Sequence, residues 1–422
     1  MANNLSLLST QSRVATPFIK VAIGEYVLGI FQKTERRGRV KFDQDGQVYK
    51  TLNIKYPNYV QSLEVKKING QVNQYTLNLT YQITPDDDPN LIEKMLSSVS
   101  TTRKITFSYG DLSAPNFIYK NEEAIIVQPS MQFSMESAQI MYTITAVSNG
   151  VLARSGSFTF KGRRAKPSDV IKSILYDKTY GLTEVFTGMR SRGKVLRDKL
   201  IADNDQIVEI DTKINITPLD YLLYLVSCMK PANTAKSKTG VYTLTIYDDT
   251  SGEYAGTYFK VTQIEKVKEA PGMVYELEIG VPNNKNVVTA LSVTNNEAWS
   301  IFYDYSKKIS DAEYVQRIDS KGNLVDVFAP IVSSGNPEFK TNASTASWWR
   351  QITQYPIKGS VTIKGLLRPA TLMQYVRLKL YYYGRLHIIS GLYIVTSQTD
   401  RVDMSGFTTT LGLLRVGGDD TI

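Results

Sequence analysis

Cysteine and histidine are almost absent from this chain of 422 residues, which contains one of each. The lone cysteine, Cys228, excludes a disulfide within the chain and a metal site made of thiolates. The lone histidine, His387, leaves the chain without a histidine cage for a metal. Cys228 lies beside Leu225 and Val226, and His387 precedes Ile388. We therefore expect a buried apolar role for the cysteine and a packing or surface role for the histidine.

Long apolar runs are also missing. No window approaches the roughly 18 uninterrupted apolar residues of a membrane span, and the first residues contain no basic region followed by an apolar core. We therefore expect no signal peptide, no stable membrane insertion, and synthesis in a cytoplasm. The mean hydropathy of -0.21 and the hydrophobic content of 42% are ordinary for a globular protein, and the length allows about three domains.

The signatures of common active sites are absent as well. There is no Gly-x-x-x-x-Gly-Lys-Ser/Thr loop, no Gly-x-Ser-x-Gly elbow, no His-Glu-x-x-His helix and no Cys-x-x-Cys pair. The consecutive acids Asp86, Asp87 and Asp88 lack the alternate spacing of a calcium loop, whereas Asp88 followed by Pro89 is typical of the start of a short helix. We predict no catalytic, cofactor-binding or metal-ligating residue, and no enzyme. A pair of catalytic carboxylates from distant positions stays open, because the chain has 40 acidic residues.

Positive charge is concentrated in one segment. The chain has a net charge of +9, and the residues between Lys161 and Lys199 include eleven basic and four acidic residues, a net charge of +7. One interpretation is a surface for phosphate groups or for an acidic partner. We favour a solvated face beside an acidic neighbour in an assembly, because aromatic residues are not interleaved with the basic ones as they are in proteins that bind single-stranded nucleic acids.

The first part of the chain has the alternation of β-strands. The first fifteen or so residues are expected to form an extended arm. Apolar and polar residues alternate from Tyr75 to Ile83, which is typical of a half-buried strand. The Asn69-Gly70 pair before this strand predicts a hairpin. Further strands are predicted at residues 18–31, 59–67, 103–109, 124–128, 131–135 and 139–147. We therefore expect residues 1–160 to form a β-barrel or sandwich with one inserted helix.

The middle of the chain changes character. Pro167-Ser168-Asp169 and Thr217-Pro218 are typical helix starts, and apolar residues at helical spacing follow each of them. Strands are predicted at residues 242–248 and 257–263. We expect a mixed α/β domain at residues 161–270.

The last part returns to β-strands. Residues 306–355 are polar and predict a loop-rich excursion, whereas Val376, Leu378 and Leu380 share one face of a strand and Arg377 and Lys379 take the other. We expect residues 271–422 to form a second β-barrel. The predicted fold is mainly β with an α+β insert: two β-barrel domains and a mixed α/β domain.

The end of the chain resembles the baseplate hub proteins of tailed bacteriophages and related injection machines. In that family a Ser-Gly-x-Tyr-x-Val strand, a turn and a Gly-aromatic-x-Thr-x-Leu-x-Leu-x-Arg strand complete a tail-tube-like barrel. The matching segments here are Ser390-Gly391-Leu392-Tyr393-Ile394-Val395, a turn carrying Asp400-Arg401, and Gly406-Phe407-Thr408-Thr409-Thr410-Leu411-Gly412-Leu413-Leu414-Arg415. The early hairpin is similar to the tube-protein barrel, and the helix at Thr217-Pro218-Leu219-Asp220 resembles the α/β domain between the two barrels of a hub.

The resemblance implies a structural protein of the virion tail baseplate, without a cofactor. It implies a homotrimer in which two tail-tube-like barrels per chain present a pseudo-sixfold ring. Such a hub joins the hexameric tail tube protein to the threefold central spike or tip protein, contacts other baseplate proteins, and lets genomic DNA pass through its channel. Two alternatives stay open: a distal tail component that binds a receptor or carbohydrate, with Trp348-Trp349 as candidate contacts, and a cell-wall-degrading tail enzyme.

Overall fold

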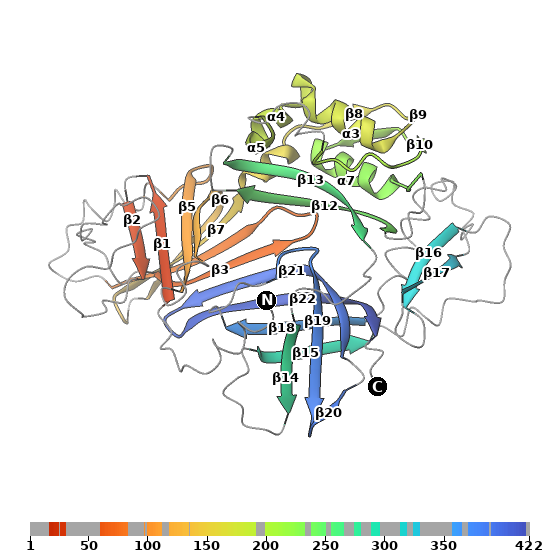
Figure 1. Cartoon of the computed structure of the whole chain (residues 1–422). Coiled ribbons are helices and arrows are strands. Elements are labelled where there is room, and N and C mark those ends of the chain that lie inside the picture. Colours follow the sequence, from red (N-terminus) through yellow and green to blue (C-terminus); the bar gives the residue numbers. More distant parts are fainter. Residues whose placement is uncertain are drawn as a thin grey trace.

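β-strands dominate the computed structural model of the chain, and the helices whose bounds the structure describes lie in its middle. The model is mainly β with a mixed helical insert, which confirms the fold class predicted from the sequence (Figure 1). The structure describes residues 17–24, 26–30, 60–82, 97, 99–111, 118–134, 136–190, 199–232, 238–249, 255–265, 274–279, 288–295, 313–318, 324–329, 357–364, 370–387 and 390–418.

Fourteen strands form one continuous, curved sheet (Figure 1). Both β regions of the chain belong to it, so the pairings of the described strands do not separate them into two sheets. The order along the sheet is β15 (Val288–Asn295), β18 (Ile357–Lys364), β22 (Gly406–Gly418), β21 (Gly391–Asp403), β3 (Val60–Ile68), β4 (Gln74–Gln82), β7 (Gln139–Ser148), β6 (Tyr119–Ser134), β5 (Lys104–Asp111), β1 (Pro17–Ile23) and β2 (Tyr26–Ile30). β19 (Tyr375–Tyr382) pairs with β21, and it also pairs with β14 (Val274–Ile279) in parallel and with β20 (Arg385–Leu386).

Burial follows the period of two that the sequence predicts. In β4, Tyr75, Leu77 and Leu79 are buried, and the polar residues between them are half-buried. Val376 and Leu378 of β19 are buried in the same way. The alternation therefore sets which face of each strand enters the core. The predicted hairpin at Asn69-Gly70 joins β3 to β4, and Gly70 adopts the left-handed conformation, with a φ of 75°, that favours glycine.

The β21–β22 hairpin joins the two ends of the chain. Its strand β22 pairs with β18 from Thr408 to Leu414. The first part of β21 pairs with β19, whereas the last part, from Ser397 onward, pairs with β3 near the start of the chain. A register shift between Val395 and Ser397 marks the point where β21 passes from one set of neighbours to the other. Opposite this shift lies Gly412, where a Cβ atom would collide with the Ser397 hydroxyl.

Each half of the sheet has its own hydrophobic core. The N-terminal core gathers side chains of β1, β3, β4, β5, β6 and β7, and it also contains Val402 and Phe407 from the C-terminal hairpin. The C-terminal core contains Val361, Leu378 and Leu411 among others. One hairpin thus contributes apolar side chains to both cores.

The helical insert packs around a third core. Thr217 caps its longest helix, because its hydroxyl accepts a hydrogen bond of 3.2 Å from the backbone N–H of Asp220. The two long helices start at the predicted prolines, Pro167 and Pro218. Figure 1 shows the helices gathered on one side of the β12–β13 hairpin. The elements are η2 (Asn149–Arg154), β8 (Phe158–Phe160), β9 (Arg163–Ala165), α3 (Pro167–Tyr176), η3 (Lys178–Tyr180), α4 (Leu182–Val185), α5 (Thr187–Arg190), β10 (Val208–Ile210), β11 (Lys213–Ile216), α7 (Pro218–Cys228), β12 (Lys238–Asp249) and β13 (Gly256–Glu265).

Several strands differ from the prediction in extent. The segment predicted as one strand at 18–31 is the β1–β2 hairpin, which turns at Gly24 with a φ of 58°. The two segments at 124–128 and 131–135 are one strand, β6, because Pro129 lies in a strand that continues to pair with β7. Within the region predicted as loop-rich, β16 (Glu313–Ile318) and β17 (Leu324–Ala329) pair with each other.

Other expectations fall outside the described residues. These are the extended arm, most of the helix predicted after Pro89, and Trp348-Trp349. The proposed domain limits at 160 and 270 remain predictions. Among the described residues, no helix is long and apolar enough to cross a membrane.

Phe407→Ala tests the link between the hairpin and the N-terminal core. Phe407 is 4% exposed and lies edge-on to Tyr109, with ring centroids 6.4 Å apart. We expect the substitution to lower the free energy of unfolding by about 3–5 kcal/mol through the cavity it leaves. Amide hydrogen exchange should rise in β3 and β5, although these strands lie far from Phe407 in sequence. Met404→Ala, at the exposed turn of the same hairpin, should change stability by less than about 0.5 kcal/mol. Unchanged exchange in β3 and β5 would contradict the link.

Candidate functional site

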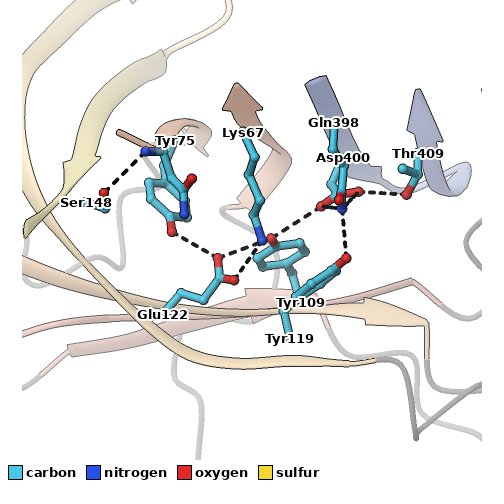
Figure 2. A network of polar contacts seen from close by, with 10 residues as sticks. Lys67, Tyr75, Tyr109, Tyr119, Glu122, Ser148, Gln398, Asp400 and Thr409 are labelled. Atoms are coloured by element: carbon cyan, nitrogen blue, oxygen red, sulfur yellow. Dashed lines mark hydrogen bonds and ion pairs between the residues drawn. The ribbon is translucent and has the colours of Figure 1, made fainter. Parts of the chain in front are cut away.

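A network of polar side chains lies inside the sheet where β21 meets β3 (Figure 2). Its members come from both ends of the chain, and most of them are buried. Polar groups in such a place must satisfy one another, since water is excluded. The labelled residues are Lys67 of β3, Tyr75 of β4, Tyr109 of β5, Tyr119 and Glu122 of β6, Ser148 of β7, Gln398 and Asp400 of β21, and Thr409 of β22.

An ion pair between Lys67 and Glu122 forms the centre of the network. Lys67 Nζ donates to Glu122 Oε1 at 2.8 Å, and the side chains are 12% and 8% exposed. The ammonium also lies 4.1 Å from the centre of the Tyr119 ring. Burial is the largest single influence and disfavours the charged amine, but attraction to Glu122, Tyr119 and Asp400, together with the hydrogen bond to Glu122, outweighs it and raises the pKa of Lys67 above its ordinary value. The lysine is therefore held as a cation.

Two tyrosines complete the coordination of Glu122. Tyr75 Oη donates to Glu122 Oε2 at 2.9 Å, and Tyr109 Oη lies 3.2 Å from the same oxygen. Burial raises the pKa of both phenols, and the nearby Glu122 carboxyl raises it further. Both phenols therefore stay protonated and act as hydrogen-bond donors. The Tyr75 ring stacks on Phe107 with centroids 4.7 Å apart, which fixes its orientation.

Asp400 brings the C-terminal hairpin into the network. Its side chain is fully buried, and Thr409 Oγ1 donates to Oδ1 at 2.7 Å. Gln398 Nε2 donates to the same carboxyl, at 2.8 Å from Oδ2, and to Tyr119 Oη at 2.8 Å. Tyr109 Oη lies 3.4 Å from Asp400 Oδ2 and so stands between the two carboxyls. Burial raises the pKa of Asp400, although Lys67 and the hydrogen bonds from Thr409 and Gln398 offset part of the increase.

The arrangement is suited to joining strands. Its two carboxyl side chains, Glu122 and Asp400, are buried, and their oxygens contact other protein groups, so the network as described offers no place for a substrate. Removing one member of such a network leaves its partners buried without hydrogen bonds, which costs free energy. The network therefore forms only when the strands pair correctly. We interpret it as the lock between β21 and the N-terminal strands.

A second polar junction ties the helical insert to the sheet. Asn69, at the β3–β4 turn, is hydrogen-bonded through its side chain to Thr243 and accepts from Thr245 Oγ1 at 3.3 Å. Further along β12, Asp248 Oδ1 accepts from Thr257 Oγ1 at 2.7 Å. Its other oxygen is buried without a hydrogen-bond partner among the described residues. Burial raises the pKa of Asp248 to about 6, and the hydrogen bond from Thr257 offsets part of the increase.

The structure places the two lone residues singled out in the sequence away from this network. Cys228 is fully buried in α7, and burial raises the pKa of its thiol, as expected of an apolar packing residue. His387 is exposed after β20. Among the described residues, no group of three or more His, Cys, Asp or Glu side chains is placed to hold a metal ion.

Residues 188–194 match the first seven positions of a phosphate-binding loop, Gly-x-x-x-x-Gly-Lys, but Val195 stands where that loop needs a serine or threonine. Such a loop follows a strand, whereas Gly188 lies in α5, after α4. A Cβ atom at Gly188 would collide with the Tyr258 ring. This glycine therefore allows α5 to approach β13.

Acidic residues from elsewhere in the insert lie beside the described part of the basic segment. Arg164 of β9 is in register with Glu209 of β10, and Lys172 Nζ forms an ion pair of 3.3 Å with Asp203. These acids come from residues beyond 199, so the excess charge of the segment is partly compensated within the insert. The residues between 191 and 198 lie outside the described part of the chain.

Sequence reasoning missed the network and placed one of its members wrongly. Asp400 and Arg401 were predicted in a turn, but both lie within β21, and the turn comes at Met404-Ser405. Asp400 is in register with Val65 and Thr409, so pairing on both sides keeps it in a strand. The alternation of Gln398, Asp400 and Val402 could have shown that Asp400 faces inward with Val402. No sequence pattern links it to Lys67 or Glu122.

Glu122→Gln tests the energetic role of the ion pair. It leaves the Lys67 ammonium buried without its carboxylate, so we expect a loss of about 3–5 kcal/mol in the free energy of unfolding by urea at neutral pH. The double variant Lys67→Met and Glu122→Gln should recover part of this loss. Lys379→Met breaks a more exposed ion pair of 3.4 Å with Glu276 and should cost at most about 1 kcal/mol. Equal losses for the two single variants would contradict the role of burial.

Asp248→Asn tests the pH dependence of the second junction. Because the pKa of Asp248 is raised in the folded state, its contribution to the free energy of unfolding is fully present below about pH 4. That contribution is lost as the pH rises toward about 6. We expect the variant to lack this loss and to exceed the wild type at pH 7 by on the order of 1–3 kcal/mol in urea unfolding. Asp177→Asn should act in the opposite direction, because hydrogen bonds from Thr179 lower the pKa of Asp177. A wild-type stability that rises across this window relative to Asp248→Asn would contradict the assignment.

Comparisons with known proteins identify similar structures but no similar sequences. No family model matches the chain, and no curated protein matches it. Similar solved structures include the 43 kDa tail protein of prophage MuSo2 from Shewanella oneidensis, with a TM-score of 0.49, 10% identity, and coverage of 95% of this chain and 98% of that one. The tail protein from Neisseria meningitidis MC58 has a TM-score of 0.46 and 9% identity, over 94% of this chain and 96% of that one.

A third similar structure is the E. coli c3393 protein, a component of the type VI secretion system with structural similarity to the T4 bacteriophage tail proteins gp27 and gp5. Its TM-score is 0.43 at 11% identity, over 85% of this chain and 74% of that one. The similar structures are thus phage tail and type VI secretion proteins, the group that the sequence resemblance indicated. At these TM-scores the similarity carries no conclusion about function.

Proposed function

We propose that this protein is a structural baseplate hub of a phage tail or a related injection machine. In this proposal, three copies form a ring that joins a hexameric tail tube to a threefold central spike or tip protein. The ring surrounds part of the channel through which the genome leaves. The proposal assigns the chain to the virion tail baseplate, with other baseplate proteins as neighbours, and gives it no enzymatic role.

The observation that carries this proposal is the fusion of two β units in one chain. Each unit has its own buried core, and the β21–β22 hairpin contributes to both. A chain with two linked units presents two β surfaces, so three copies can present six. A closed ring of identical chains requires heterologous contacts around a rotation axis, and fused units supply the doubled number of positions.

The segment that carries the sequence resemblance also supports the proposal. The Ser390 to Arg415 pattern occupies β21 and β22, the strands that join the two units. The segment therefore has a defined structural role as the connection between the halves. The network of Lys67, Glu122 and Asp400 makes that connection specific to one register.

The geometry favours neither alternative. The candidate carbohydrate contacts, Trp348-Trp349, lie outside the described residues. The buried carboxyls Glu122 and Asp400 are engaged by other protein groups, so they do not supply an accessible acid and base for wall hydrolysis.

The oligomeric state of the full chain tests the proposed function. We expect native mass spectrometry or light scattering of the purified protein, or of the particle that contains it, to give a homotrimer. Electron microscopy should show a ring with a central channel between a sixfold and a threefold component. A monomer both in solution and in assembled particles would overturn the proposal. Met404→Ala, at an exposed turn, is the control variant and should have the same oligomeric state as the wild type.

A further inference from the structure

The two buried carboxyls of the network have unequal partners. Glu122 receives the Lys67 ammonium and the Tyr75 hydroxyl. Asp400 receives neutral donors, Thr409 and Gln398. The site thus contains two acids, Glu122 and Asp400, but one cation, Lys67, which contacts Glu122. If both acids were ionised, the interior would hold an excess negative charge, which is costly in a medium of low polarity.

The single hydroxyl hydrogen of Tyr109 also indicates that the Glu122 and Asp400 carboxyls differ. A phenol carries one hydrogen, but Tyr109 Oη faces two carboxyl oxygens, Glu122 Oε2 at 3.2 Å and Asp400 Oδ2 at 3.4 Å. Its hydrogen goes to the nearer one, Glu122. The Tyr109 oxygen then turns a lone pair toward Asp400 Oδ2. A hydrogen lies between these two oxygens if Asp400 supplies it.

We propose that Asp400 is a neutral carboxylic acid at neutral pH and acts as a pH-sensitive latch between the C-terminal hairpin and the N-terminal strands. Its Oδ2–H donates to Tyr109 Oη, which donates to Glu122. Its Oδ1 accepts from Thr409. When the O–H bond of Asp400 breaks, the proton leaves to solvent and the negative charge stays in the core.

The groups that face Asp400 come from every strand packed against it. β3 supplies Lys67, β5 supplies Tyr109, β6 supplies Tyr119 and Glu122, and β22 supplies Thr409. Lys67 and the hydrogen bonds from Thr409 and from Gln398 of β21 itself favour ionisation, and Glu122 opposes it. Burial is the largest influence, and it raises the pKa of the Asp400 carboxyl. The direction agrees with the geometry.

Because of the position of Asp400, its ionisation affects the contact between β21 and β3. It lies in the seven-residue part of β21 that is in register with β3, opposite Val65, and its other neighbour is Thr409. A charge there repels Glu122 across the junction and loses the hydrogen bond to Tyr109. Rising pH therefore loosens the contact between β21 and β3, and falling pH closes it. This inference concerns the fold, and it stands whether or not the chain forms a trimer.

Asp400→Asn in an Asp248→Asn background tests the latch. The second substitution removes the other acid whose pKa burial raises. Asparagine mimics the neutral acid, because its Nδ2–H can donate to Tyr109 while its oxygen accepts from Thr409 and from Gln398 Nε2, which lies 3.0 Å from Asp400 Oδ1. In the background chain, the unfolding equilibrium constant should rise by up to about tenfold per pH unit above the ordinary Asp range until Asp400 ionises in the folded protein. Relative to Asp400→Asn, this rise should extend to at least pH 7.

Asp403→Asn in the same background is the matched control. Asp403 lies on the same strand, and although burial opposes its ionisation, hydrogen bonds from Ser405 and the ion pair with Arg401 lower its pKa. Its removal should change the pH profile in the opposite sense. Hydrogen exchange of the β3 and β21 amides, corrected for intrinsic rates, should rise with pH in the background chain and stay flat in Asp400→Asn.

Infrared spectroscopy of the background chain with 13C-labelled aspartate gives a readout that does not depend on folding of the variant. We expect a protonated carboxyl band at pH 7 that disappears on further increase of pH. The band should be absent from Asp400→Asn and present in Asp403→Asn. Absence of this band at pH 7 would overturn the proposal. So would a loss of stability in Asp400→Asn at pH 7 as large as that of Glu122→Gln, since a required carboxylate anion would explain it.

Discussion

The pairing of β21 with β3 is the constraint on which the rest of the structure depends. It connects strands more than 300 positions apart in sequence and turns two groups of strands into one sheet. The apolar side chains Val402 and Phe407 make this pairing favourable by entering the N-terminal core. Without it, the last hairpin would leave those side chains in water and β3 with an unpaired edge.

Polar groups make that pairing selective. Apolar contacts tolerate small shifts, but a one-residue slip of β21 against β3 would turn both Gln398 and Asp400 outward, away from Tyr119 and Tyr109. The cost of unsatisfied buried groups therefore penalises every wrong register. A buried ion pair such as Lys67 and Glu122 adds little net stability by itself, and its value here is the specificity of the arrangement. The two junctions of the sheet, at Asp400 and at Asp248, both contain acids whose pKa burial raises.

Much of the fold was predictable because its signals are local. The alternation in β4 and β19, the hairpin at Asn69-Gly70 and the helix start at Thr217 each depend on a few neighbouring residues, and the structure confirms them. The limits of strands were less predictable. Residues 124–128 and 131–135 were predicted as two strands, yet pairing with β7 carries β6 through Pro129. The turn expected at Asp400 failed for the same reason, since pairing with β3 and β22 extends β21 beyond the local signal.

The sequence by itself determined the mainly β class, the helical insert, and the inward faces of β4 and β19, because periodicity and capping act over a few residues. It also determined that the lone Cys228 forms no disulfide within the chain. Only the tertiary structure decided that Lys67 pairs with Glu122 and that Tyr109 lies between Glu122 and Asp400. Their contacts span up to 291 positions, and no local pattern records which strands become neighbours across such a distance. The polar lock therefore became visible only when both ends of the chain were placed in one sheet.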